Sequence, residues 1–151
     1  MDKNKSIQVL QAYATGLAAQ SYGHRVQSKI FADQGFGKLA EKYAGHADEE
    51  MGWVDQFNER ILDLGATPKL NAVPEQPVYT DPVAFIKADL EISHKEVPAL
   101  IALTATLADD FKTYDILKAY ALDEEDDMFW MEQQLDLIEK IGLQNWLVKQ
   151  L

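Results

Sequence analysis

The tetrapeptide Glu50-Met51-Gly52-Trp53 lies at the centre of a long helical pattern. Around it, apolar residues recur at steps of three and four, which is the spacing of one face of an α-helix. The stripe consists of Phe36, Leu39, Ala40, Tyr43, Ala47, Val54, Phe57, Ile61 and Leu64. Glu50 falls on this same stripe. Because a buried carboxylate is costly unless it is paired or binds a metal, Glu50 indicates a polar centre inside the fold.

A second pair of carboxylates lies on the inward face of a later helix. Glu124 sits on an apolar stripe, and Asp127 follows three residues later on the same side. That stripe consists of Leu117, Tyr120, Ala121, Met128, Met131, Leu135 and Ile138. Inward carboxylates on two helices of one domain indicate a polar centre in a helical bundle, and a metal ion is the leading explanation. The sequence therefore predicts Glu50, Glu124 and Asp127 as metal-binding residues.

The rest of the chain predicts two further long helices and contains no strand pattern. The helices that contain Glu50 and Glu124 extend over about 36–64 and 112–141, and another apolar stripe predicts a helix over about 5–32. Asp81-Pro82 opens another helix as its N-cap and first-turn proline. The first two helices are joined by a short turn, so we expect them to be antiparallel neighbours.

A proline-containing connection and a glycine stop complete the pattern. Residues 66–80 have no helical period and are long enough, when extended, to cross a bundle from end to end. Gly142 ends the last long helix, so 144–151 can form a short fifth helix. We expect an all-α, antiparallel four-helix bundle with a long crossover, in which residues 1–151 form a single domain.

Composition limits the classes of function. With 25 acidic and 14 basic residues the net charge is -11, which repels nucleic acid and anionic membranes and attracts cations. There is no cysteine, so disulfides, thiolate ligands and thiol catalysis are excluded. The start, MDKNKS, has no apolar signal core, and no run approaches transmembrane length. We expect a cytoplasmic protein without nucleic-acid or membrane partners.

The carboxylates fit the frame of a di-iron bundle, but most of its ligands are replaced. In such bundles two helices give one glutamate each and the other two give a Glu-x-x-His pair. Here Trp53 and Asp127 stand where the two histidines belong. Leu17 and Ser93 occupy the stripe positions of the two single glutamates.

At these residues the chain resembles the bacterioferritins. The resemblance is closest in Asp123-Glu124-Glu125 and over 133–147, and it continues over 58–64. It covers nearly the whole chain, including the short fifth helix. The resemblance implies a ferritin-like cage of 24 subunits that stores oxidised iron, with a ferroxidase centre in each bundle. It also implies haem b between pairs of subunits, held by one methionine from each.

Position by position, the resemblance implies that the ferroxidase half is eroded and the haem half is retained. The ferroxidase positions would be Leu17, Glu50, Trp53, Ser93, Glu124 and Asp127. Only the two glutamates match, with Asp127 as a substitute. The haem methionine, which follows the glutamate of the second helix, is present as Met51. Some members of the family look like two-subunit systems, and this chain resembles the haem-binding subunit rather than the ferroxidase-competent one.

The metal-binding residues also have plainer explanations. The carboxylates could be relics that are neutralised by Lys or Arg, by water or by a shared proton. His46 lies four residues before Glu50 on a neighbouring part of one helical face. It could join the carboxylates in a rebuilt metal site, or it could be structural.

Met51 and His24 can also be explained as structural residues. Met51 could be an ordinary packing residue at a subunit interface, and Asp48 and Asp55 near it would have to point away from a haem. His24 lies on the inward face of the first helix, where we expect a hydrogen-bonded core histidine and not a ligand.

The leading hypothesis is therefore an iron-storage cage subunit that binds haem through Met51 and has little ferroxidase activity of its own. A ferroxidase-competent paralogous subunit would then oxidise the iron. The first alternative is a self-sufficient ferroxidase with a remodelled metal site of His46, Glu50, Glu124 and Asp127. The second is a non-catalytic structural bundle without haem or iron.

Overall fold

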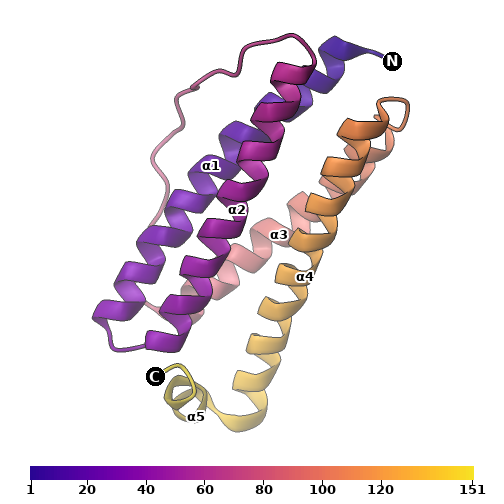
Figure 1. Cartoon of the computed structure of the whole chain (residues 1–151). Helices are drawn as coiled ribbons and strands as arrows, with labels where there is room; N and C mark the ends of the chain where they lie inside the picture. The colour runs from indigo at the N-terminus through magenta and orange to yellow at the C-terminus, as the bar shows by residue number, and fades with distance from the viewer.

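The computed structural model covers residues 1–151 and contains five α-helices and no strands. They are α1 (Lys3–Asp33), α2 (Gly37–Asp63), α3 (Pro82–Ala105), α4 (Phe111–Ile141) and α5 (Leu143–Val148). Figure 1 shows α1 beside α2 and α3 beside α4 as two antiparallel hairpins, with α5 at one end. The predicted all-α bundle with a short fifth helix is confirmed, and the predicted helix ends lie close to the observed ones.

The helix ends are set by local chemistry. Asp2, Asp81 and Asp110 are N-cap residues whose side chains accept hydrogen bonds from the backbone of the first turns of α1, α3 and α4. Gly142 has a φ of 83°, a left-handed conformation that favours glycine, and it separates α4 from α5. The predicted cap at Asp81-Pro82 and the stop at Gly142 are therefore confirmed.

The inward face of α1 carries hydroxyls as well as apolar groups. Ser21 and Ser28 are buried, and each donates a 2.7 Å hydrogen bond to a backbone carbonyl of α2, at Ala47 and Ala40 respectively. Small side chains at these positions let the two helices approach closely, and the hydroxyls are satisfied without water. This packing fixes the register of α1 against α2.

The core consists of two apolar clusters separated along the bundle. One joins Leu10, Leu17, Val54, Phe57, Ile61, Leu117 and Tyr120, among others. The other joins Phe31, Leu39, Tyr43, Phe85, Ile86, Met131 and Trp146, among others. On α1 and α2, the residues between these clusters include the buried polar side chains of His24, His46 and Glu50. The polar centre therefore lies in the middle of the bundle, with an apolar core on either side.

The crossover between α2 and α3 is held against α1 by two glutamines. Gln11 bonds both the backbone N–H and the carbonyl of Lys69, at 2.7 Å and 3.1 Å. Gln27 does the same for Tyr79, with both bonds at 2.9 Å. Figure 1 shows this segment running along the first hairpin from one end to the other. The predicted end-to-end crossover is observed. The two glutamine side chains supply hydrogen bonds for backbone groups of the crossover that have no partner in a helix or sheet.

The short α5 closes the end of the bundle where the α1–α2 turn lies. Trp146 is fully buried in the second apolar cluster, and its indole N–H donates to Gln134 at 3.0 Å. The backbone of Lys38, at the start of α2, donates to the carbonyl of Gln150 at 2.9 Å. None of the helices is both long enough and apolar enough to span a membrane.

Candidate functional site

The centre of the bundle is a three-helix ion cluster around His24. The Nδ1 of His24 on α1 lies 2.5 Å from Oε1 of Glu50 on α2, and its Nε2 lies 3.0 Å from Oδ2 of Asp89 on α3. Gln20 donates to the other oxygen of Glu50 at 2.6 Å. Both oxygens of Glu50 are thus engaged by protein donors, and the expectation that His24 is a hydrogen-bonded core histidine is confirmed.

His24 carries the positive charge of this cluster. Burial alone would lower its pKa, but the hydrogen bonds to Asp89 and Glu50 outweigh burial and raise the pKa of His24 to about 10. At neutral pH it is an imidazolium that donates from both nitrogens, so it has no lone pair for a metal. Burial raises the pKa of Glu50, and the hydrogen bond from His24 opposes that rise. The buried carboxylate is neutralised by a cation that belongs to the chain itself.

Three of the positions where the resemblance expects iron ligands hold other groups. Leu17 is buried in the apolar core, and Ser93 is half-buried on α3. The indole N–H of Trp53 donates to Oδ2 of Asp123 on α4 at 2.9 Å. An indole is a donor only and cannot coordinate a metal ion. Trp53 therefore orients a carboxylate instead of binding iron.

Glu124 and Asp127 lie in the same region on α4 but lack full hydrogen-bond partners. The Oε1 of Glu124 is buried without a partner. Burial, followed by repulsion from Glu50 and Asp127, raises the pKa of Glu124 to about 8. Burial, followed by repulsion from Asp123 and Glu49, raises the pKa of Asp127 to about 7. Both carboxyls are destabilised as anions, which a bound cation would reverse.

His46 is the second buried histidine of the centre, and its state is opposite to that of His24. Burial, together with the positive charge of His24, lowers the pKa of His46 to about 4. Its Nε2 has no hydrogen-bond partner and lies 3.5 Å from Oδ1 of Asp127. His46 is therefore a neutral imidazole beside a carboxylate that it does not bond.

Carboxylates of three residues converge at the side of this centre. Oxygen atoms of Glu49, Asp123 and Asp127 all lie within 4.8 Å of one another. Glu49 is exposed, whereas Asp123 and Asp127 are partly buried. The structure thus brings Asp127 next to His46 and to this group, while Glu50 belongs to the His24 cluster.

Met51 lies outside the centre, although it is next to Glu50 in the chain. Its side chain is 39% exposed, whereas Glu50 is 2% exposed. Asp48, one turn earlier, forms a 2.6 Å ion pair with Arg25 of α1, and Asp55 is exposed. The acidic side chain of Asp48 is thus neutralised, and the thioether of Met51 is accessible at the surface.

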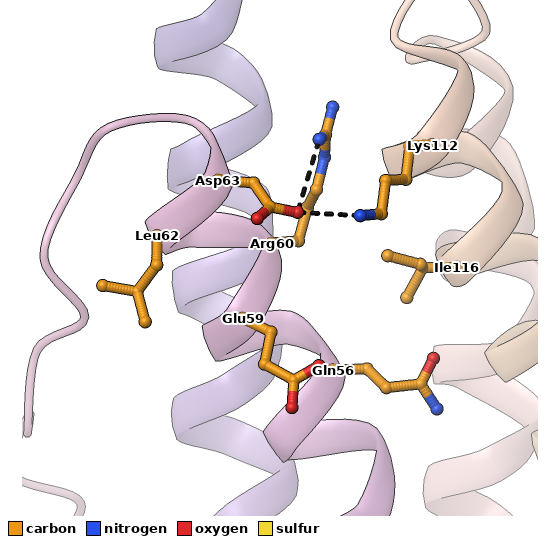
Figure 2. A pocket seen from close by; sticks show the side chains of 7 residues that line it. All are labelled: Gln56, Glu59, Arg60, Leu62, Asp63, Lys112 and Ile116. Carbon is orange, nitrogen blue, oxygen red and sulfur yellow. Dashed lines mark hydrogen bonds and ion pairs between the residues drawn. The ribbon is translucent and has the colours of Figure 1, made fainter.

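A separate hollow of about 430 Å³ lies between the end of α2 and the start of α4 (Figure 2). In it Asp63 bonds Lys112 at 2.8 Å and contacts Arg60 at 3.7 Å, and Arg60 also bonds the buried Asp110 at 2.7 Å. The basic side chains that line this hollow are already paired with carboxylates, and these ion pairs connect α2 to α4. We therefore assign no ligand to the hollow.

Sequence reasoning missed Gln20, Asp89, Asp123 and Glu49 as parts of the centre. Gln20 and Asp89 are polar residues one position away from the apolar stripes, at Ser21 and Leu90. That offset was a signal for a partly inward side chain, but it does not identify the partner atom on another helix. Asp123 follows the same rule beside Glu124.

Two long helical hairpins around a buried carboxylate centre define a ferritin-like helical bundle. The family model of the ferritin-like domain matches residues 9–141. The chain is 36% identical over 149 residues to the bacterial ferritin of Pseudomonas aeruginosa, covering 96% of each chain. It is 39% identical over 130 residues to that of Neisseria meningitidis, covering 83% of each. It is 26% identical over 123 residues to the bacterioferritin of Rhodobacter capsulatus, covering 80% of this chain and 76% of the relative. The chain belongs to the ferritin-like family of iron-storage proteins.

Proposed function

We propose that this chain is a bacterioferritin-like subunit that forms the shell of an iron-storage cage, binds haem through Met51 and has lost most of its own ferroxidase centre. The cage would contain 24 subunits and reside in the cytoplasm. Iron oxidation would come from a paralogous subunit with intact Glu-x-x-His pairs. In this proposal the acidic residues of the chain attract ferrous ions, which are the cargo of the cage.

The main support for a lost ferroxidase centre is that both carboxylate oxygens of Glu50 are hydrogen-bonded to protein side chains. In a di-iron bundle this glutamate gives its oxygens to iron, but here His24 and Gln20 hold both oxygens at 2.5 Å and 2.6 Å. A metal ion would have to displace these donors and would then lie beside an imidazolium, which repels it. Leu17 and Trp53 add no ligand to compensate. Two irons therefore lack a ligand set in this bundle.

Haem binding rests on the accessibility of Met51. A thioether is a known ligand of haem iron, and a methionine that is 39% exposed would be accessible to a haem shared with a second subunit. The next residue, Gly52, is also exposed and carries no side chain that could cover this surface. Arg25 neutralises Asp48 and so removes one of the two acidic obstacles. Haem b, when bound there, supplies one-electron transfer for the release of stored iron.

The experiment on the ferroxidase half compares oxidation of ferrous iron by the pure chain with oxidation by a mixed cage. We expect the pure chain to oxidise ferrous iron in air no faster than buffer. Co-assembly with a bacterioferritin subunit that has intact Glu-x-x-His pairs should give an initial rate proportional to the fraction of that subunit. Rapid oxidation by the pure chain, abolished in Glu124→Gln, would contradict the proposal.

That contradictory result would favour the second candidate, a self-sufficient ferroxidase with a remodelled site of His46, Glu50, Glu124 and Asp127. The observation in its favour is that Nε2 of His46 and Oε1 of Glu124 are buried without partners. The third candidate, a structural bundle without haem or iron, predicts a colourless protein whose Met51→Leu variant is indistinguishable from the parent.

A further inference from the structure

The imidazole ring of His24 lies between two carboxylates that come from different helices. Its Nδ1 faces Glu50 of α2 at 2.5 Å, and its Nε2 faces Asp89 of α3 at 3.0 Å. Ionised carboxylates only accept hydrogen bonds, so each ring nitrogen has to donate a proton to its neighbour. The contacts therefore favour an imidazolium, which connects α1, α2 and α3 through a single positive charge.

The ring is also held in this position by its packing. Tyr43 of α2 and Phe85 of α3 have ring centroids 5.5 Å and 6.0 Å from that of His24. Ser21, three residues before His24, bonds the backbone of α2 at 2.7 Å and fixes α1 against α2 at this level. The histidine itself is only 5% exposed. An ion that approached Glu50 from this side would have to displace a packed ring as well as a hydrogen bond.

The charge of His24 opposes a metal ion as strongly as its position does. The side chains of Glu50 and Asp89 are 2% and 13% exposed, so the two carboxylates need a cation near them. The imidazolium supplies that cation. A divalent ion placed beside it would meet a positive charge at short distance in a poorly solvated interior, where the repulsion between the two is large.

We propose that His24 is the residue that excludes divalent metal ions from this bundle, because it supplies the chain's own cation between Glu50 and Asp89. This inference rests on the proposed loss of the di-iron centre and names the residue that maintains that loss. It predicts that removal of the imidazole alone, with no ligand restored, opens a metal site that uses Glu50 and Asp89. Asp89 is not one of the positions where the resemblance expects a ligand, so this site is not a restored di-iron centre.

Gln20 provides the internal comparison for this proposal. Its amide holds the second oxygen of Glu50 at 2.6 Å, so Gln20→Ala frees one carboxylate oxygen and leaves the imidazolium in place. His24→Ala frees the other oxygen and also removes the charge and the ring. If the charge and position of His24 exclude the ion, only the second substitution permits binding.

The test uses Mn²⁺ as the probe, because carboxylate oxygens suit this ion and the electron paramagnetic resonance signal of the free ion falls when it binds. The full chain is freed of metal with a chelator and titrated with MnCl₂ at pH 7. The acidic surface attracts some Mn²⁺ in every variant, so the measured quantity is binding beyond that of the parent. We expect one additional ion per chain in His24→Ala, bound at least tenfold more tightly than the surface ions, and none in Gln20→Ala. Mn²⁺ should raise the Tm of His24→Ala only.

Second substitutions in the His24→Ala chain locate the additional ion. Glu50→Gln and Asp89→Asn should each weaken its binding at least tenfold. Glu49→Gln changes an exposed carboxylate of the neighbouring acidic group and is the matched control, which should bind the additional ion like His24→Ala itself. His24→Ser repeats the test with a small polar side chain of the kind that α1 already buries at Ser21, in case the alanine variant folds poorly.

Three outcomes would overturn the inference. The first is that neither His24→Ala nor His24→Ser gains an ion, or that neither chain folds even with Mn²⁺ present. The second is an equal gain in Gln20→Ala, which would assign the exclusion to the blocked carboxylate oxygen and not to the cation. The third is an additional ion that is lost with Glu49→Gln but kept with Glu50→Gln. Tight Mn²⁺ binding by the parent that disappears in Glu50→Gln is a different result, because it would also contradict the proposed loss of the ferroxidase centre.

Discussion

Replacing His24 with leucine removes the cation that holds the buried centre together. His24 bonds Glu50 at 2.5 Å and Asp89 at 3.0 Å, so the variant loses two charge-assisted hydrogen bonds. Bonds of this kind contribute roughly 1.5–3 kcal/mol each, and removal of one partner of a buried ion pair costs roughly 3–5 kcal/mol. Gln20 still donates to Glu50, and a proton can neutralise the carboxyl. We therefore expect His24→Leu to lower the free energy of unfolding by about 3 kcal/mol near neutral pH.

The loss has a defined dependence on pH. The pKa of His24 is raised to about 10 in the fold from 6.5 as the ordinary value. A histidine whose folded pKa is raised contributes stability that is fully present below pH 6.5 and disappears as the pH rises through 10. The difference between parent and His24→Leu should therefore be largest at about pH 6.5 and below, and it should shrink as the pH rises from 6.5 to about 10.

Thermal and urea unfolding, followed by circular dichroism at equal protein concentration, measure the effect. A loss of about 3 kcal/mol corresponds to a decrease in Tm of roughly 6–12 °C for a domain of this size. The matched control is His94→Leu, because His94 bonds Glu132 at 2.7 Å but the two side chains are 52% and 42% exposed. We expect that control to stay within about 0.5 kcal/mol of the parent. Equal losses in the two variants, or a loss at His24 that does not change with pH, would refute the reasoning.

Three further substitutions test other parts of the fold. Gln27→Ala removes both hydrogen bonds to the backbone of Tyr79 and should lower the free energy of unfolding in urea by about 1–2 kcal/mol. Proteolysis within the crossover should become faster, and an unchanged cleavage rate would contradict the role of Gln27 in holding the crossover. In metal-free buffer the pKa of Glu124, raised to about 8, makes the parent lose stability as the pH rises from about 4.5 to 8. Glu124→Gln should remove roughly 2–4 kcal/mol of that loss. If the free energies of unfolding of parent and variant changed with pH in parallel, the raised pKa of Glu124 would be contradicted. Trp146→Ala empties a fully buried site and should lower the free energy of unfolding by roughly 3–5 kcal/mol. The control Phe111→Ala changes a side chain that is 80% exposed and should lower it by less than about 0.5 kcal/mol. Similar losses in the two variants would contradict the packing of α5 against the bundle.

The helices and their order could be predicted because each depends on local information. The apolar stripe through Ala47 and Val54 marks the buried face of α2, and it also predicts that Glu50 points inward, where the structure finds it 2% exposed. Asp81 caps α3 through its own side chain, and Gly142 adopts a conformation that favours glycine. No information about other helices is needed for these features.

The centre could be predicted only in part because its contacts depend on the relative positions of the helices. A stripe indicates that His24 faces inward, but not that Glu50 and Asp89 lie on opposite sides of its ring. That arrangement depends on the register of α1 against α2 and α3, which small residues such as Ser21 set through packing. The difference between His24 and His46 has the same origin: the sequence places His24 on an inward stripe and His46 beside one, and only the neighbours on other helices decide which of the two is charged.

The most direct test of the account is the absorption spectrum of the chain purified with haem available, measured beside its Met51→Leu variant. Leucine keeps the volume of methionine and removes only the thioether, so the comparison isolates the ligand. We predict a Soret band and reduced-minus-oxidised bands of methionine-ligated haem in the parent, and their loss in Met51→Leu. Identical spectra of the two proteins, with or without a Soret band, would contradict haem binding through Met51.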